Sequence, residues 1–167
     1  MIDLCHWTII CHSNNLSGSK IPEGIVRISA KAEYACVAMV DLAFRYRAGQ
    51  PVQIKTIGEN HGISTRFLVQ ILLQLKGAGL VASSRGAAGG YQLARPPESI
   101  SLAEIVNTID HSPEPSSALN ALPSSVAESL RQVWKEVKQA EQAILQKTTL
   151  ADIARRVLEK DVASYQI

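Results

Sequence analysis

The spacing of apolar residues predicts a mainly helical protein with one short β-hairpin. In six segments, apolar side chains recur every three to four residues, which is the period of an α-helix. These segments are residues 30–46, 54–60, 65–76, 102–109, 126–147 and 150–160. Two strand-like runs, residues 81–85 and 91–94, flank a tip made almost entirely of glycine and alanine. This order of elements predicts a helix-turn-helix with a β-hairpin wing, followed by a long C-terminal helix.

Side-chain oxygens mark where these helices begin. A serine or threonine placed just before a helix accepts a hydrogen bond from an orphan amide of the first turn. The residues in this position are Ser29, Ser64 and Thr149. Ser101 with Glu104, and Ser125 with Glu128, have the spacing of a capping box, in which each side chain bonds the other residue's amide. The second box makes Ser125 the cap of the long helix, which is therefore expected to begin at Val126.

Two apolar stripes are expected to form the core. In the first helix the stripe is Ala32, Ala35, Cys36, Met39, Val40 and Ala43, and in residues 65–76 it is Leu68, Ile71, Leu72 and Leu75. Cys36 lies within its stripe, so we interpret it as a small core residue, with a redox sensor as the alternative. Gly58 costs its helix about 1 kcal/mol relative to alanine, which suggests that another helix passes close by.

The face opposite the second stripe has the chemistry of a DNA-reading surface. Arg66, Gln70 and Leu73 project there, with Val69 and Gln74 beside them. We call these five residues the reading face. Arginine and glutamine read base edges in a major groove, and apolar groups contact thymine methyls. A mixed solvent-exposed face is the alternative.

The predicted wing carries Arg85 at the edge of its glycine-rich tip. Glycine permits backbone conformations and close approaches that a Cβ forbids, so such a tip can be pressed against another molecule. An ordinary surface hairpin is the alternative. The helix-turn-helix before the wing favours the nucleic-acid interpretation.

Positive charge is concentrated in the middle of the chain. Between Phe44 and Arg95 there are seven basic residues and one acid, Glu59, although the whole chain has a net charge of only +2. The basic residues are Arg45, Arg47, Lys55, Arg66, Lys76, Arg85 and Arg95. A basic middle with acidic flanks is typical of a nucleic-acid surface, although ordinary solvated faces would also account for it.

The long helix carries a seam that calls for a partner. Its apolar residues, spaced 4, 3, 4, 3 and 4 apart, are Val126, Leu130, Val133, Val137, Ala140 and Ile144, and Trp134 lies beside them. This heptad spacing predicts packing against another helix, and we favour a homodimer over a partner from the same chain. The last helix is expected to fold back over this seam.

The first 25 residues fit this pattern poorly. The Cys5-His6 and Cys11-His12 pairs offer four zinc ligands, but their spacing matches no standard finger. The alternative is a loosely ordered extension, or an upstream start with Val26 as the true first residue. The predicted organisation is thus an extension (1–25), a winged helix-turn-helix domain (26–110), a linker (111–123) and dimerisation helices (124–167). We see no secretory signal or membrane-spanning run, and three cysteines form no even disulfide framework, so a cytoplasmic location is expected.

Five stretches together resemble one bacterial family. They are SAKAEYA (29–35), GIS (62–64), KGAGL (76–80), RGAAGGYQLARPP (85–97) and TTLAD (148–152). Over residues 27–160 the chain resembles the winged-helix transcription regulators that include IscR, NsrR and CymR. The resemblance implies a dimer that places two recognition helices in successive major grooves and each wing in a minor groove.

The resemblance also assigns residues to DNA contact. They are Ser64, Thr65, Arg66, Phe67 and Gln70 in the helix, and Arg85 and Gly86, followed by Gly89 and Gly90, in the wing. Members often have a glutamate where this chain has Val69. Glutamate accepts a hydrogen bond from cytosine and valine does not, so the preferred DNA sequence should differ.

A second departure concerns the cofactor. Iron–sulfur members have three clustered cysteines in the interval that corresponds to residues 111–125, and this chain has none there. Because thiolates hold such clusters, we predict no iron–sulfur cluster. Members that regulate cysteine metabolism take their signal from a partner enzyme or a small molecule, and both routes remain open here.

These observations favour a sequence-specific DNA-binding repressor that binds a palindromic operator as a homodimer. The alternative is a winged-helix module that binds and regulates a partner enzyme. Catalysis is not expected, because the sequence has no paired carboxylates in a plausible pocket, no Ser/His/Asp arrangement and no phosphate-binding loop.

Overall fold

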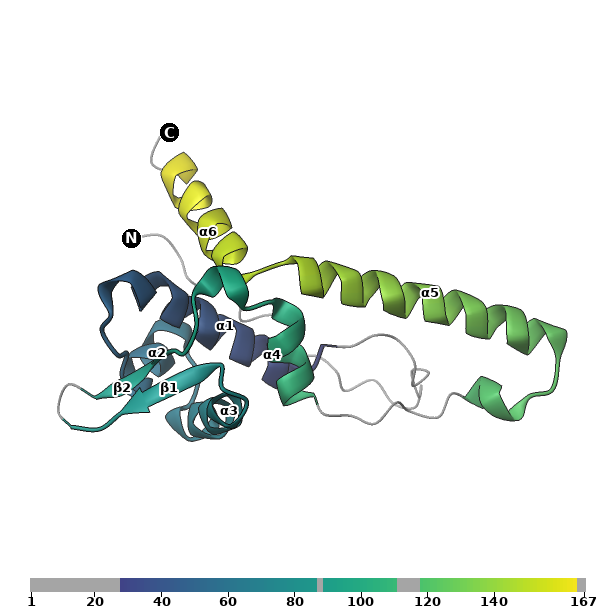
Figure 1. The fold of residues 1–167 in the computed structure, drawn as a ribbon, viewed down its shortest axis with the longest axis horizontal. Coiled ribbons are helices and arrows are strands. Elements are labelled where there is room, and N and C mark those ends of the chain that lie inside the picture. The colour runs from purple at the N-terminus through teal and green to yellow at the C-terminus, as the bar shows by residue number, and fades with distance from the viewer. Residues whose placement is uncertain (1–27, 87–88, 111–117, 165–167) are drawn as a thin grey trace.

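The computed structural model describes residues 28–86, 89–110 and 118–164 (Figure 1). The helices and strands are α1 (Ala30–Arg45), α2 (Ile54–His61), α3 (Thr65–Gly77), β1 (Val81–Ser84), β2 (Gly90–Leu93), α4 (Leu102–Ile109), α5 (Ser125–Lys147) and α6 (Leu150–Ser164). Short 3₁₀ turns are η1 (Tyr46–Ala48), η2 (Pro97–Ser99) and η3 (Ala118–Ala121). The prediction of a mainly helical chain with one hairpin is confirmed. The extension predicted over residues 1–25, with its four candidate zinc ligands, lies outside the described residues.

Helix α1 lies at the centre of the core. Its buried side consists largely of small side chains, which allow neighbouring elements to approach closely, and it packs against α3, α4, α6 and β2. Cys36 and Val40, predicted within the stripe, lie half buried at its edge. Ser29 caps the helix as predicted: its hydroxyl accepts a hydrogen bond from the Ala32 amide at 3.1 Å.

The helix-turn-helix is built around a tight turn between α2 and α3. The predicted stripe of α3 is fully buried, and Ser64 caps the helix through the Phe67 amide at 3.3 Å. Gly58 is buried, but its nearest neighbour is not another helix. A Cβ on Gly58 would lie 2.7 Å from the backbone oxygen of Ile63 in the turn. The turn therefore requires the glycine, and α3 also passes close by, as predicted: the Cβ would lie 3.4 Å from the Thr65 side chain and 3.6 Å from the Leu68 side chain.

The wing is a two-stranded antiparallel sheet, and one further residue pairs with its second strand. Its register pairs Val81 with Leu93 and Ser84 with Gly90. Val52, just before α2, forms an isolated bridge with Tyr91 through two backbone hydrogen bonds of 2.8 Å. The bridge ties the wing to the chain that enters the helix-turn-helix, and the sequence did not reveal it.

The capping boxes differ from expectation in one case. The Ser101–Glu104 box is present, with both of its hydrogen bonds formed. The box predicted from Ser125 to Glu128 is wrong: the cap of α5 is Ser124, whose hydroxyl accepts from the Ala127 amide at 3.1 Å. Ser124 has an extended backbone, so α5 starts one residue earlier than predicted, and Glu128 bonds Arg131 instead.

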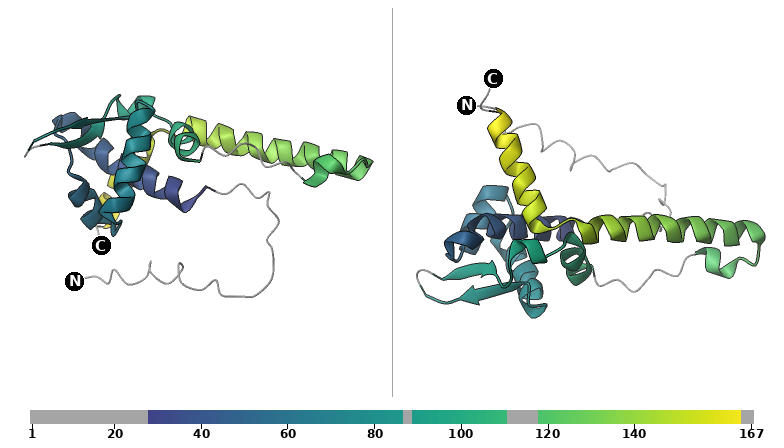
Figure 2. Two further views of the ribbon diagram at one scale, coloured as in Figure 1. Left: turned by 90° about the horizontal axis from the view of Figure 1, so that it is seen from below. Right: turned by 45° about the horizontal axis from the view of Figure 1, so that its top comes forward.

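Helix α6 packs against α1 and η2 rather than returning over α5, so the predicted fold-back is wrong. Figures 1 and 2 show α5 extending away from the other helices and α6 leaving in a different direction. The first residue of α6, Leu150, is fully buried in the core, which fixes this direction. Two backbone hydrogen bonds secure the junction, from Leu102 to Thr148 at 2.9 Å and from Leu150 to Ile100 at 3.0 Å.

Candidate nucleic-acid interface

The N-terminal half of α3 presents the predicted reading residues to solvent. Ser64, Thr65, Arg66 and Gln70 are exposed, and Leu73 further along the reading face is 55% exposed. Val69 is exposed beside these residues, so two apolar side chains accompany Arg66 and Gln70, as contact with thymine methyls would require. The buried stripe therefore orients a face of mixed polar and apolar chemistry outward.

Phe67 lies differently from the other predicted contacts. Its ring is half buried and meets the ring of Tyr34 on α1 edge to face, with centroids 5.7 Å apart. Such aromatic pairs contribute about 0.5–1.5 kcal/mol beyond their buried area. Phe67 thus helps to set the orientation of α3, and its contact with DNA stays a prediction.

The described part of the wing shows why its tip needs glycine. Gly86 has a φ of +106°, a conformation that L side chains rarely adopt, and Arg85 just before it is exposed. A Cβ on Gly89 would lie 2.6 Å from the Ser84 carbonyl oxygen, and one on Gly90 would lie 2.5 Å from that of Val52. Gly89 and Gly90 are therefore explained by close packing against the backbone of residues 84–86 and of Val52.

Ion pairs divide the basic residues into two groups. Arg95 pairs with Glu104 at 2.9 Å, and Lys55 pairs with Glu59 at 3.7 Å, so their charges are partly compensated. In the part of the chain that the structure describes, Arg66 and Arg85 have no acidic partner within ion-pair distance. Arg66 and Arg85 are thus among the basic residues of this stretch whose charge no described acidic side chain compensates.

The predicted dimerisation seam lies open along α5. Exposed fractions are 67% for Val126, 40% for Leu130, 47% for Val133, 54% for Trp134, 46% for Val137 and 67% for Ile144, and Ala140 is also exposed. Ala127 is the one fully buried residue of this helix. A row of large apolar side chains exposed on one helix face marks an interaction surface.

The described residues do not fit an iron–sulfur cluster. Cys36 is the one cysteine among them, and burial raises the pKa of its thiol to about 11, with Glu33 and Asp110 adding to the shift. The raised pKa favours the neutral thiol over the thiolate that iron binds. No group of three or more histidine, cysteine or acidic side chains is placed to share a metal ion within the described ranges. In that same part of the chain, no helix is both long and apolar enough to span a membrane.

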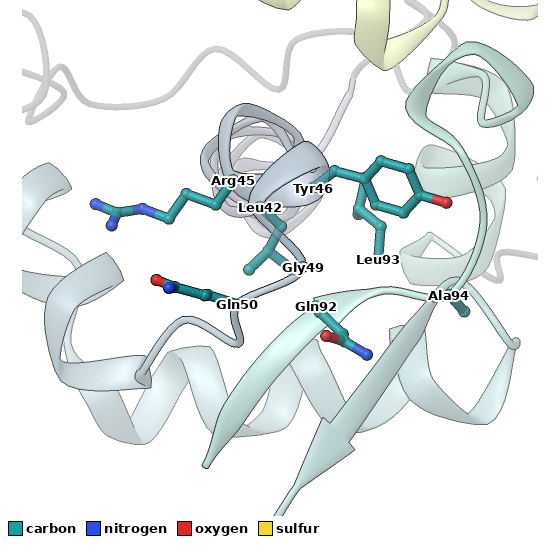
Figure 3. A pocket seen from close by; sticks show the side chains of 8 residues that line it. All are labelled: Leu42, Arg45, Tyr46, Gly49, Gln50, Gln92, Leu93 and Ala94. Carbon is teal, nitrogen blue, oxygen red and sulfur yellow. The ribbon is translucent and has the colours of Figure 1, made fainter. Parts of the chain in front are cut away.

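A shallow recess of about 370 Å³ lies between the end of α1 and β2, and the sequence analysis did not predict it (Figure 3). Its lining is Leu42, Arg45, Tyr46, Gly49, Gln50, Gln92, Leu93 and Ala94. Figure 3 shows the side chains of Arg45 and Tyr46 extending to opposite sides. These polar groups do not converge on one point, so the recess lacks the arrangement of a ligand-binding site.

Helix α3 after a tight turn, the adjoining hairpin and the exposed cations define a winged helix-turn-helix of the kind found in transcription regulators. The chain belongs to the Rrf2 family, whose model, described as an iron-dependent transcriptional regulator, matches residues 28–156. Membership confirms the resemblance seen in the sequence. It places the chain among regulators rather than enzymes.

Individual relatives agree with this assignment. Rv1287 of Mycobacterium tuberculosis, named as an HTH-type transcriptional regulator, is 42% identical over 142 residues, which cover 83% of this chain and 87% of that protein. The structure of CymR, the global cysteine regulator of B. subtilis, superimposes with a TM-score of 0.70 at 30% identity, covering 79% of this chain and 98% of CymR. IscR of T. potens gives a TM-score of 0.64 at 35% identity, covering 85% and 92%.

Proposed function

We propose that this regulator is a cytoplasmic, sequence-specific repressor that binds a palindromic operator as a homodimer. Each α3 would enter a major groove and each wing the neighbouring minor groove. One observation supports this most directly: Arg66 and Gln70 on α3 and Arg85 at the wing are exposed on adjacent elements, and neither arginine has an acidic partner among the described residues. Phosphate contacts supply affinity, and these side chains would supply discrimination between sequences.

The open seam of α5 supports the homodimer. A second copy would cover the same apolar row on both chains, as a two-fold interface requires. Two-fold symmetry in turn predicts half-sites one helical turn of DNA apart, or a multiple of it. The palindromic operator follows from the symmetry of the dimer.

We also propose that the protein works without an iron–sulfur cluster. The interval 111–125 has no cysteine, and Cys36 favours its neutral thiol. Regulation would then come from a small molecule or a partner enzyme. Cluster-like visible absorbance in protein purified without oxygen would contradict this proposal.

Genome-wide mapping of bound DNA tests the function as a whole. We expect enrichment of a small set of promoter fragments that share an inverted repeat, and repression of the adjacent genes that is lost on deletion. A gel-shift titration with an enriched fragment, against a scrambled fragment of equal length, measures specificity. Equal affinity for both fragments, or no enrichment, would contradict the proposal.

A further inference from the structure

The junction of α3 and β1, which we call the notch, would face a sugar–phosphate strand if α3 and the wing occupy adjacent grooves. Neighbouring major and minor grooves of a duplex are separated by one such strand. Helix α3 ends at Gly77 and β1 starts at Val81, and the two elements pack against each other. The strand that separates their grooves would therefore run across this notch.

A lysine and a serine meet at the notch. The Lys76 ammonium donates a hydrogen bond to the Ser83 hydroxyl oxygen at 2.6 Å, and both side chains are exposed. Ser83 is two residues after the buried Val81 in β1, so the two residues lie on the same face of the strand. The hydrogen bond thus joins the last turn of the recognition helix to the stem of the wing.

The backbone beside this pair is open. Arg66, Gln70, Leu73 and Gly77 follow one another at intervals of four, three and four residues, so they lie in one row along α3. The last member of this row is a glycine, so the row ends without a side chain. A Cβ built on Gly77 would have no neighbour within 4 Å, so packing within the chain does not require glycine there. The glycine leaves room for another molecule to approach the backbone.

We propose that Lys76, Gly77 and Ser83 form a phosphate seat, which binds one backbone phosphate of double-stranded DNA. An ammonium has three donors, of which Lys76 gives one to Ser83, and the serine hydroxyl keeps its own proton to donate. Donors from both side chains therefore remain for a phosphate oxygen. Electrostatics agrees, because the sequence has no acidic residue between Glu59 and Glu98.

Lys76 and Ser83 would have different roles in the phosphate seat. Lys76 would supply charge, and Ser83 would position the ammonium over the notch. Neither would distinguish one base from another, since phosphate contacts carry no direct sequence information. The seat would fix the register of α3 in the groove so that Arg66 and Gln70 meet base edges.

This inference rests on the proposed DNA binding, and a fluorescein-labelled mixed-sequence duplex tests it. Binding to such a duplex depends mainly on phosphate contacts, so the operator need not be known. Fluorescence anisotropy at several KCl concentrations gives the slope of log affinity against log salt. Lys76→Ala should weaken binding and reduce that slope by about one per subunit on the duplex. Lys76→Arg should restore it.

Ser83→Ala should separate positioning from charge. It keeps the ammonium but loses the hydrogen bond that holds it, so the salt slope should change little while affinity falls about two- to tenfold. The matched control is Lys135→Ala, which removes an exposed lysine from α5, opposite the seam. It should leave slope and affinity unchanged.

The outcomes separate the two proposals. If the unaltered protein ignores the duplex at low salt, the proposed function itself fails. If it binds but Lys76→Ala keeps the full slope, the phosphate seat is wrong even where affinity falls. Equal melting temperatures by circular dichroism check that each variant is folded.

Discussion

Ser29 and Asp110 are joined by two hydrogen bonds across 81 residues of sequence. The Ser29 hydroxyl donates to Asp110 Oδ1 at 2.5 Å, and the Ser29 amide donates to Oδ2 at 3.1 Å. The same hydroxyl accepts from Ala32, so one serine both caps α1 and holds the residue that follows α4. The start of the central helix and the end of α4 are therefore fixed to each other.

Removal of this carboxylate should destabilise the fold. Asp110→Ala leaves the Ser29 hydroxyl and amide without their partly buried acceptor, at a cost of about 1–3 kcal/mol in the free energy of unfolding. Urea denaturation followed by circular dichroism measures the loss. Glu98→Ala, which removes an exposed acid from η2, is the control and should stay within about 0.5 kcal/mol. An equal effect of both changes would contradict the role given to Asp110.

Arg85 at the wing should contribute to operator affinity. If the side chain makes a specific contact, Arg85→Ala should weaken binding by about 1–3 kcal/mol in a gel-shift titration. Folding should not change, because the side chain is exposed and has no ion-pair partner among the residues described. Arg156→Ala on α6, which removes an exposed arginine far from the wing, serves as the control. If the two variants bind the operator with equal affinity, the wing does not take part in the mechanism.

A charge in the α5 seam should prevent dimerisation. Val137→Glu places a carboxylate in the apolar row, and two copies meeting there would bury like charges. We expect sedimentation velocity to show a shift from dimer to monomer, with loss of operator binding. Lys135→Glu makes the control change on the opposite side of the helix. A dimer that survives Val137→Glu would show that another surface joins the subunits.

Acid should weaken the cap of α6. The carboxylate of Asp152 accepts hydrogen bonds from the Thr149 amide at 3.0 Å and hydroxyl at 2.8 Å, and these bonds lower its pKa below the ordinary 3.8. A group whose pKa is lowered by folding stabilises the fold above its ordinary pKa, and the effect is lost as pH falls through the lowered value. Asp152→Asn should therefore be less stable than the unaltered protein at neutral pH, and thermal melts should show the difference shrinking below pH 3.8. A difference that stays constant into acid would contradict this linkage.

The sequence predicted the elements that local spacing controls. The stripe of α3 follows from four apolar residues at helical intervals, and its burial exposes the reading face on the other side. Choices between neighbouring residues were harder. Ser124 and Ser125 are both good caps, and only the backbone conformation shows that Ser124 is used.

Long-range contacts explain what sequence could not give. Asp41 is only 8% exposed, although it projects from the side of α1 opposite the predicted stripe. His61 and Asn60 from the end of α2 cover it, at 3.6 and 3.4 Å from the Asp41 carboxylate. The direction of α6 likewise depends on Leu150 entering a core formed by distant segments. Periodicity within one segment carries no information about such neighbours.

The backbone bonds of Thr148 and Leu150 to the start of α4 determine how movement would pass through a dimer. These hydrogen bonds attach the C-terminal end of α5 directly to the domain that contains α3 and the wing. In a symmetric dimer, any change in the angle between the two α5 helices would therefore move both recognition helices together. The crossing angle of the two α5 helices would then determine the distance between half-sites that the dimer can span.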